Sequence, residues 1–163
     1  MADIVNERVC AEVDGEVVVF PIGMRINKLL KVWKWFPVMM AMPRVLRELA
    51  EHPELGLISA TGHFGLRNLW SQQYWKSAAH LQAYAHGSNR VHLPAWQAFN
   101  RSVGTNGDVG IWHETYVVPA GNLETIYVNM PRHGLGRAGS LFPARGQRAT
   151  AAKRLIRAGG NCA

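Results

Sequence analysis

The chain has 163 residues, of which 48% are hydrophobic, and this is enough for one domain with an apolar core. Its formal net charge of +7 arises in residues 132–163, which hold seven Lys or Arg and no acidic residue. The sequence lacks a run of about 20 apolar residues, which argues against a membrane-spanning helix, and its acidic start predicts a cytoplasmic protein. Cys10 and Cys162 lack metal-type spacing, so we expect free thiols.

The first part of the chain predicts a strand followed by a helix. Residues 16–25 are rich in Val, which favours a strand, and Pro21 is expected to bulge that strand or place it at a sheet edge. Apolar side chains then recur at helical spacing over residues 27–49, with Asn27 as the candidate N-cap. Two prolines inside this segment are expected to kink or divide the helix.

The remainder of the body predicts further strands and two more helices. The strands are expected at residues 55–64, 65–75, 108–118 and 123–130. Ser77 is the candidate N-cap of the next helix, because its hydroxyl can accept from the free amides of the first turn. A further helix is expected between Asn89 and Gly104.

This order of elements predicts an α+β fold. The sequence β-α-β-β-α-β with an extra strand is that of the ferredoxin-like split βαβ plan, an antiparallel sheet with helices on one face. Aromatic side chains on the bare face would need a partner, so we expect a homodimer in which two sheets face each other, a dimeric α/β barrel.

The basic residues cluster at the end of the chain. We therefore expect residues 1–139 to form the folded domain and residues 140–163 to form a basic C-terminal tail, flexible or with a short helix at 150–158. Such a tail could bind nucleic acid, but no recognition motif accompanies it and no aromatic residues alternate with its arginines. We therefore expect no nucleic-acid partner.

Five segments of the chain carry a resemblance to a known family. They are VFPIGMRINK at 19–28, YWKS at 74–77, HLPAW at 92–96, GIWHETY at 110–116 and IYVNMP at 126–131. Together they resemble the fumagillin-pathway polyketide monooxygenase-like family. The resemblance implies the dimeric α/β-barrel superfamily, which includes cofactor-free antibiotic-biosynthesis monooxygenases, haem-degrading monooxygenases and haem-containing aldoxime dehydratases.

The haem-degrading members suggest one cofactor. Trp75, Tyr84 and His92 resemble their series of a strand-end Trp-Lys-Ser, an aromatic residue one helix later and an iron-binding histidine. The resemblance therefore implies haem as a possible cofactor, with His92 as its ligand, and no cofactor if the chain follows the cofactor-free members.

Two histidines are candidates for a role in catalysis. His113 is expected within a strand, buried, on the same face as Ile111 and Thr115, while its two neighbours face the other way. A buried neutral imidazole can act as a base, bind a metal or satisfy a structural hydrogen bond. His92 precedes a predicted helix, where it could be an axial ligand, a base or a capping residue.

The third candidate is Arg67. An arginine within an apolar strand is costly to bury without an anion, so it could bind an enolate, a carboxylate or a haem propionate. Pairing with Glu114 or a position at a sheet edge would also explain it.

These residues predict an oxygenase that acts on a hydrophobic aromatic or polyketide-type substrate in a pocket between sheet and helices. His113 or His92 would take a proton, and Arg67 or Trp75 would stabilise the anion. The predicted substrate-binding residues are Trp33, Met39 and Tyr84. One alternative is a haem enzyme of the same superfamily, with iron bound by His92 or His113, and another is a non-catalytic binder of lipophilic ligands.

Overall fold

The structure, a computed structural model, describes residues 3–87, 104, 106–119 and 121–158. Its strands are β1 (Ile4–Glu12), β2 (Val17–Ile26), β3 (Leu57–Phe64), β4 (Asn68–Trp75), β5 (Val109–His113), β6 (Tyr116–Val118), β7 (Tyr127–Pro131) and β8 (Ser140–Pro143). Its helices are α1 (Val32–Glu51), α2 (Ala78–His86), α4 (Leu135–Ala138) and α5 (Ala151–Ala158), with short 3-10 turns at η1 (Pro53–Leu55) and η2 (Gly146–Arg148).

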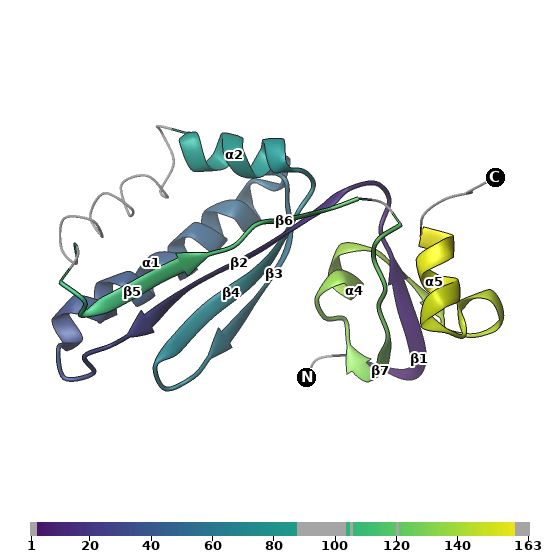
Figure 1. Cartoon of the computed structure of the whole chain (residues 1–163), viewed down its shortest axis with the longest axis horizontal. Helices are drawn as coiled ribbons and strands as arrows, with labels where there is room; N and C mark the ends of the chain where they lie inside the picture. Colours follow the sequence, from purple (N-terminus) through teal and green to yellow (C-terminus); the bar gives the residue numbers. More distant parts are fainter. Residues whose placement is uncertain (1–2, 88–103, 105, 120, 159–163) are drawn as a thin grey trace.

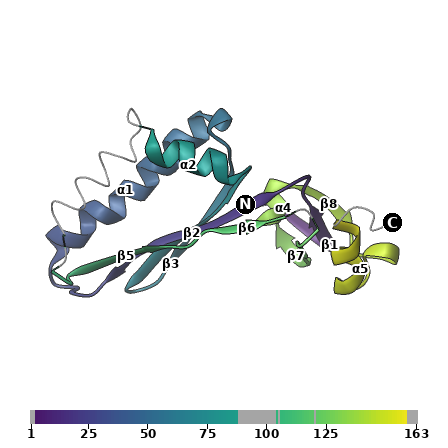
Figure 2. The same ribbon diagram turned by 45° about the horizontal axis from the view of Figure 1, so that its top comes forward.

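The main sheet has the order β3-β4-β2-β5, and β6 continues beside β2 where β5 has ended. All of its pairings are antiparallel. Helices α1 and α2 lie together on one face, which we call the helix face, and we call the opposite one the open face (Figures 1 and 2). The predicted ferredoxin-like split βαβ plan is therefore confirmed.

Alternation along the strands assigns residues to these two faces. Val18, Phe20 and Met24 of β2 pack against the helices, whereas Val17 and Val19 face the other way. The core beneath α1 and α2 holds the fully buried side chains of Val18, Leu49 and Trp75, with Val45, Leu81 and Tyr84. A second cluster lies beneath the start of α1, around Met24, Ile26 and Val109.

The sequence suggested that Pro21 would bulge its strand or place it at a sheet edge. The strand is not at an edge, because β2 pairs with β4 on one side and with β5 and β6 on the other. The carbonyl of Pro21 accepts from the amide of Glu114 at 3.0 Å, so the missing N–H of Pro21 faces the same neighbouring segment. The ladder is interrupted there, and the predicted single strand at 108–118 is two strands, β5 and β6.

The first helix also differs from the prediction. It begins at Val32 and runs without interruption through both Pro37 and Pro43, so the prolines do not divide it. Asn27 is not its cap, because Lys31 occupies the cap position, and the side-chain nitrogen of Asn27 donates instead to the carbonyl of Gly107 at 3.0 Å. The predicted cap of α2 is confirmed, since the Ser77 hydroxyl accepts from the amide of His80.

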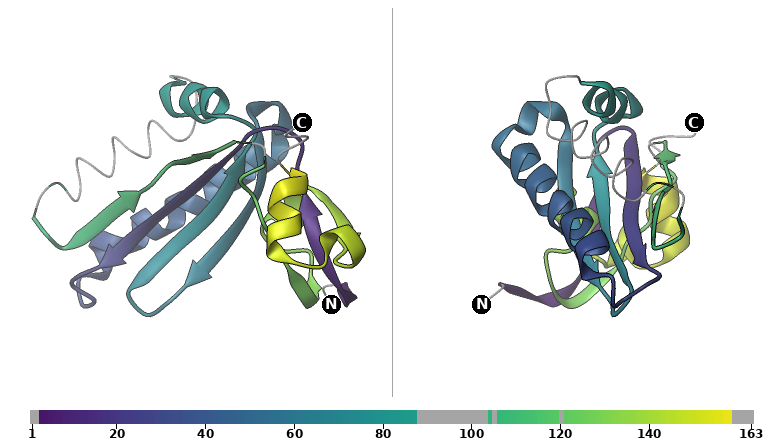
Figure 3. Two further views of the ribbon diagram at one scale, coloured as in Figure 1. Left: turned by 45° about the vertical axis from the view of Figure 1, so that its right-hand side comes forward. Right: turned by 90° about the vertical axis from the view of Figure 1, so that its left-hand side faces the viewer.

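A second sheet, which the sequence did not predict, has the order β7-β1-β8. Strand β8 lies in the segment expected to be a basic tail, and the short helix expected there is α5, which lies beside β1 (Figure 3). Arg148 binds Glu12 through two hydrogen bonds, and Arg154 binds Glu124. The basic segment is therefore packed against the body over β8 and η2, while the domain boundary at residue 139 stays a prediction.

The two sheets are joined by one apolar cluster. Val17 of β2, Tyr74 of β4 and Leu135 of α4 are its buried members, and Ala11 and Leu123 pack against it. The cluster covers the end of the open face that lies nearest to the small sheet. Within the described residues, no helix is long and apolar enough to cross a membrane.

Candidate active site

The helix face of β4 carries polar groups where apolar side chains would be expected. Ser71, Gln73 and Trp75 alternate along the strand toward α1 and α2, and their exposed fractions are 2%, 2% and 1%. The Trp75 indole N–H donates to Gln73 Oε1 at 3.0 Å. Gln73 Nε2 in turn donates to the thioether sulfur of Met42 on α1, at 3.7 Å.

One atom of this set lacks a partner. The Ser71 Oγ is buried and makes no hydrogen bond among the described residues. A buried hydroxyl without a partner costs roughly 1–3 kcal/mol, so such a group is usually completed by a water or a ligand. The Ser71 hydroxyl is therefore available to a group bound between the sheet and α1.

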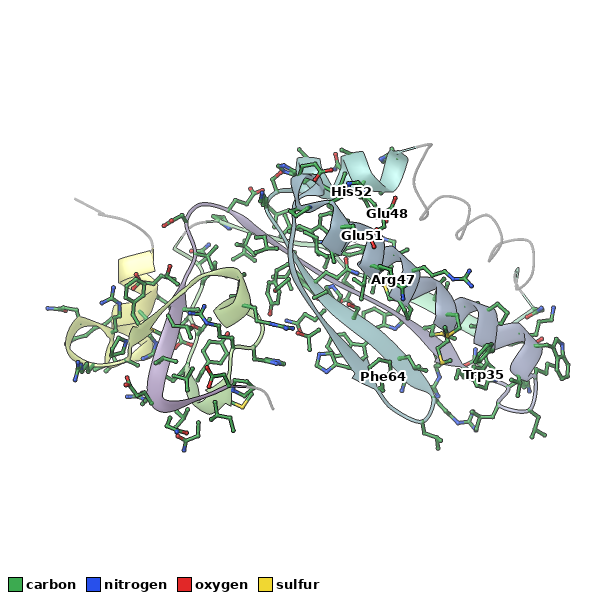
Figure 4. The ribbon with its side chains drawn as sticks, turned by 180° about the vertical axis from the view of Figure 1, so that it is seen from behind. Trp35, Arg47, Glu48, Glu51, His52 and Phe64 are labelled. Atoms are coloured by element: carbon green, nitrogen blue, oxygen red, sulfur yellow. The ribbon has the colours of Figure 1, made fainter. Side chains whose placement is uncertain are left out.

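Tyr84 and Trp75 form the aromatic wall of the same layer. Their ring centroids are 5.7 Å apart, and the Tyr84 hydroxyl donates to Glu48 Oε2 at 2.7 Å. Glu48 lies on the part of α1 near α2 (Figure 4). Tyr84 is only 5% exposed, so its ring lies inside the layer, and its role in substrate binding stays a prediction.

His113 lies on the helix face, as its position in the strand predicted. It pairs with Ile22 of β2, and its ring centroid is 5.4 Å from that of Phe20. The expectation of a buried, mid-strand histidine was wrong, because β5 ends at His113 and the residue is exposed. Its imidazole has no hydrogen-bond partner in the described part of the chain.

The strand registers bring His113 and Ser71 onto one row. Ile22 pairs with His113 on one side and with Ser71 on the other, and Ser71 pairs with Gly62 of β3. Two strand spacings separate the histidine from the serine, roughly 10 Å. An imidazole and a hydroxyl that both lack a hydrogen-bond partner among the described residues thus flank an apolar floor made by Ile22, with Phe20 in the next row.

Arg67 lies outside this group. It is in the turn between β3 and β4, not within a strand, and its guanidinium donates to the backbone carbonyls of Ile26 and Asn27 at 3.4 and 3.1 Å. Ile26 lies four positions beyond Ile22 along β2, so roughly 13 Å separate these two residues. The structure therefore does not bring Arg67 together with His113.

The remaining predicted site residues do not lie together in the structure. Met39 packs against the cluster around Met24, while Trp33 is 67% exposed at the start of α1. His92 lies outside the described residues. Among the residues that are described, no three His, Cys, Asp or Glu side chains gather as a metal site.

Sequence reasoning missed two features of the sheet. One is the pair Ser71 and Gln73. The sequence indicated it by placing two polar residues at alternate positions of the strand before Trp75. The other is a groove of about 380 Å³ on the open face, lined by Val19, Pro21, Trp70, Gln72, Trp112, Glu114 and Tyr116.

Comparison with known proteins gives one family match. The model of a family described as monooxygenase af470-like matches residues 17–135. The chain is 28% identical over 161 residues to monooxygenase af470 of Aspergillus fumigatus, and the alignment covers 84% of this chain and 56% of that relative. The chain thus spans little more than half the length of the relative it matches.

Two solved structures are similar in fold. Aldoxime dehydratase OxdRE, crystallised in complex with butyraldoxime, superposes with a TM-score of 0.65 at 16% identity, over 85% of this chain and 44% of that one. A dimeric ferredoxin-like protein of unknown function from Jannaschia gives a TM-score of 0.43 at 20% identity, over 60% of this chain and 97% of that one. At such identities, the first likeness concerns the fold alone.

Proposed function

Because the chain belongs to the monooxygenase af470-like family, we propose that it is an oxygenase acting on a hydrophobic aromatic or polyketide-type substrate between the five-stranded sheet and its helices. The observation that carries the proposal is the row formed by His113, Ile22 and Ser71. It offers a proton acceptor and a hydrogen-bond donor on either side of an apolar floor, which suits a flat substrate with one acidic C–H bond that is conjugated with a carbonyl group across the ring system.

In the cofactor-free form of this reaction, the substrate supplies the electrons. His113 removes a proton from the carbon that is conjugated with the carbonyl, and Ser71 Oγ donates to the enolate oxygen on which the charge is then delocalised. The carbanion is oxidised by dioxygen with formation of a C–O bond, and loss of water from the hydroperoxide leaves a ketone. Overall, a CH₂ group and O₂ become a C=O group and H₂O.

The substrate would lie against aromatic and sulfur-containing side chains. Phe20 and Trp75 contribute from the sheet, Tyr84 from α2, and Met42 from α1. Unbranched methionine side chains adapt to ligands of different shape, which suits α1 as the movable wall of a pocket. Met39 lies one turn earlier on the same helix. Trp33 is a proposed contact only for a ligand that reaches the start of α1.

An anthrone tests the proposal directly, because its oxidation consumes dioxygen and yields a coloured quinone. With 1,8-dihydroxyanthrone as the probe, we expect the protein to accelerate oxygen uptake and His113→Ala to lower the rate by about 100-fold or more. His63→Ala is the matched control, since His63 stacks on Trp70 on the open face. Loss of activity in His92→Ala alone would move the role of the base to His92.

A second form of the function uses haem. The observation that favours it is the imidazole of His113 beside Phe20, which has no hydrogen-bond partner among the described residues and would be able to bind the iron of a haem on this apolar face. Bound haem would supply an iron centre for oxygen or oxime chemistry. The chain's own contribution would be the imidazole of His113 or His92 and the apolar wall of Trp75, Met39 and Trp33.

Hemin titration separates the two forms. A stoichiometric Soret band that disappears in His113→Ala or His92→Ala, but not in His63→Ala, would support the haem form and identify the ligand. No specific band together with oxygen uptake supports the cofactor-free form. If neither appears and a co-purified lipophilic ligand is found, the chain is the non-catalytic binder.

We also propose that the chain forms a homodimer through its open face. Trp112 and Tyr116 are 38% and 51% exposed there, and burying such side chains is favourable. Light scattering on the purified chain should give twice the mass of 18.1 kDa. A monomer at all concentrations would contradict this assembly.

A further inference from the structure

Large apolar side chains are exposed on two segments that lie at the same end of the five-stranded sheet. These segments are the turn between β3 and β4 and the start of α1, and their end of the sheet points away from the small sheet (Figures 1 and 2). Phe64 and Leu66 at the turn are each 83% exposed, while Leu30 and Trp33 at the start of α1 are 91% and 67% exposed. We call these four residues the apolar tip. Single exposed apolar residues are ordinary, whereas a group of them marks a contact surface.

Hydrogen bonds join the two segments that carry the apolar tip. The guanidinium of Arg67, next to Leu66 in the turn, donates to the carbonyl of Asn27 at 3.1 Å. The turn is therefore bonded to the end of β2, close in sequence to Leu30. The Trp35 indole donates to the carbonyl of Leu29 at 3.0 Å, which fixes the segment before α1 against the first turn of the helix.

The same segments also bury apolar side chains, so the apolar tip is not a region that failed to pack. Leu29 and Trp35 pack against the cluster around Met24, together with Leu69 of β4. Leu69 is the strand partner of the exposed Phe64. Buried and exposed apolar residues thus alternate here, and the exposed ones form a second apolar surface that faces outward.

Cations surround the apolar tip. Residues 25–47 contain six Lys or Arg and no Asp or Glu, and residues 60–69 add Arg67 and no acid. The six are Arg25, Lys28, Lys31, Lys34, Arg44 and Arg47. A carboxylate from elsewhere in the chain, Asp108, binds Lys31 at 2.9 Å. The excess of positive charge around the tip favours an anionic partner.

The proposed homodimer would leave the apolar tip exposed. His63 stacks on Trp70 on the open face, so its neighbour Phe64 points to the helix side of the sheet. The start of α1, which carries Trp33, lies on that side as well (Figure 2). A second copy seated on the open face therefore does not cover the tip.

From these observations, we infer that the apolar tip docks on the surface of an anionic phospholipid bilayer. Trp, Phe and Leu side chains that project from a turn and a helix start can enter the boundary between headgroups and acyl chains. The lysines and arginines around them attract anionic headgroups, and each cation near the surface strengthens binding by about fivefold. The inference goes beyond the proposed oxygenase activity and does not depend on it.

Co-sedimentation of the full chain with vesicles tests the inference. The vesicles consist of phosphatidylcholine alone or of phosphatidylcholine with about 30% phosphatidylserine. We expect binding to the anionic vesicles to be at least about tenfold tighter. Leu66→Ser should weaken binding to the anionic vesicles by about tenfold, because it removes an inserted side chain. Lys28→Gln should weaken it by about fivefold.

Two substitutions in the C-terminal segment, which is also basic, are the matched controls. Leu155→Ser removes a leucine that is 41% exposed on α5, and Arg145→Gln removes an exposed arginine. Neither should change vesicle binding. Oxygen uptake with the anthrone probe is measured without vesicles, and Leu66→Ser should leave it unchanged, so the oxygenase proposal and this inference fail independently.

Four results would overturn the inference. The first two are no sedimentation with either kind of vesicle and equal binding to both kinds. The third is a loss of binding in the two control variants but not in Leu66→Ser and Lys28→Gln, which would assign the contact to the C-terminal segment. The fourth is association beyond a dimer that Leu66→Ser abolishes, without vesicle binding, which would show that another copy of the chain covers the tip.

Discussion

The backbone amide of Glu114 donates to the carbonyl of Pro21 at 3.0 Å, between the end of β5 and the start of β6. An antiparallel pair at this position would normally share two hydrogen bonds, and proline permits one. The interruption separates His113, which precedes it on the helix face, from Tyr116, which follows it on the open face. A single proline thus interrupts the ladder directly after His113, whose imidazole is exposed.

Gly23→Ala should destabilise the fold. A Cβ at this position would lie 2.5 Å from the Cβ of Trp70 and 2.8 Å from the carbonyl oxygen of Leu69, so the sheet must shift. We expect a loss of about 1–3 kcal/mol in the free energy of unfolding, measured by urea denaturation. Gly110→Ala is the matched control, because its nearest contact is 3.8 Å away and its midpoint should change little. Equal effects of the two substitutions would contradict the close approach at Gly23.

Tyr84→Phe should also lower stability. The substitution removes the hydrogen bond from a buried phenol to Glu48, and bonds to charged groups contribute about 1.5–3 kcal/mol. Tyr116→Phe removes a similar bond to Glu114 at an exposed site, and it should leave the free energy of unfolding nearly unchanged. A smaller effect for Tyr84 than for Tyr116 would show that the Glu48 bond does not stabilise the layer.

Arg154→Met should loosen the C-terminal segment. Arg154 is 8% exposed, its guanidinium binds Glu124, and it donates to the carbonyl of Arg148 at 2.9 Å. Removing it leaves Glu124 partly buried without that partner, at a cost of about 2–4 kcal/mol. Limited proteolysis should then cleave within residues 144–158 sooner than in the wild type. Arg145→Met, at an exposed position, should leave the cleavage rate unchanged.

Stability should fall at alkaline pH. Burial raises the pKa of Cys10 from its ordinary value of 9.0, and burial raises the pKa values of Tyr74 and Tyr127 from 10.0. The folded state holds these protons more tightly than the unfolded state, so the contribution is complete below pH 9.0 and is lost as pH rises through the folded-state pKa values. The urea midpoint should be flat up to that pH and then decline. Cys10→Ala and Tyr127→Phe should each reduce the decline, and a midpoint that rises there would contradict the assignment.

Local signals account for the parts of the fold that were predicted correctly. Ser77 caps its helix with a neighbour three residues away, and alternation alone placed His113 on the face opposite to Trp112. The errors arose where distant residues decide the outcome. His113 is exposed because the ladder stops at Pro21, on another strand, and Arg67 lies in a turn because the hairpin after Gly65 is longer than expected. Strand β1 was missed because its partners follow it by more than 100 residues.

The candidate site was predictable only in part. Trp75 and Tyr84 were identified as neighbours of a ligand and do lie in one layer. Ser71 was not identified as a candidate. It became one only because it shares a row of the sheet with His113 through Ile22, and the register between strands is not visible in one sequence.

The placement of β1 also determines when this protein can complete its fold during translation. Strand β1 is synthesised before β2 to β6, yet its two neighbours are β7 and β8, and β8 ends at Pro143. The strands of the five-stranded sheet end at Val118, so this sheet can assemble before β7 and β8 have been synthesised. Over that interval β1 has two unpaired edges, which is the condition under which nascent chains associate wrongly or recruit chaperones.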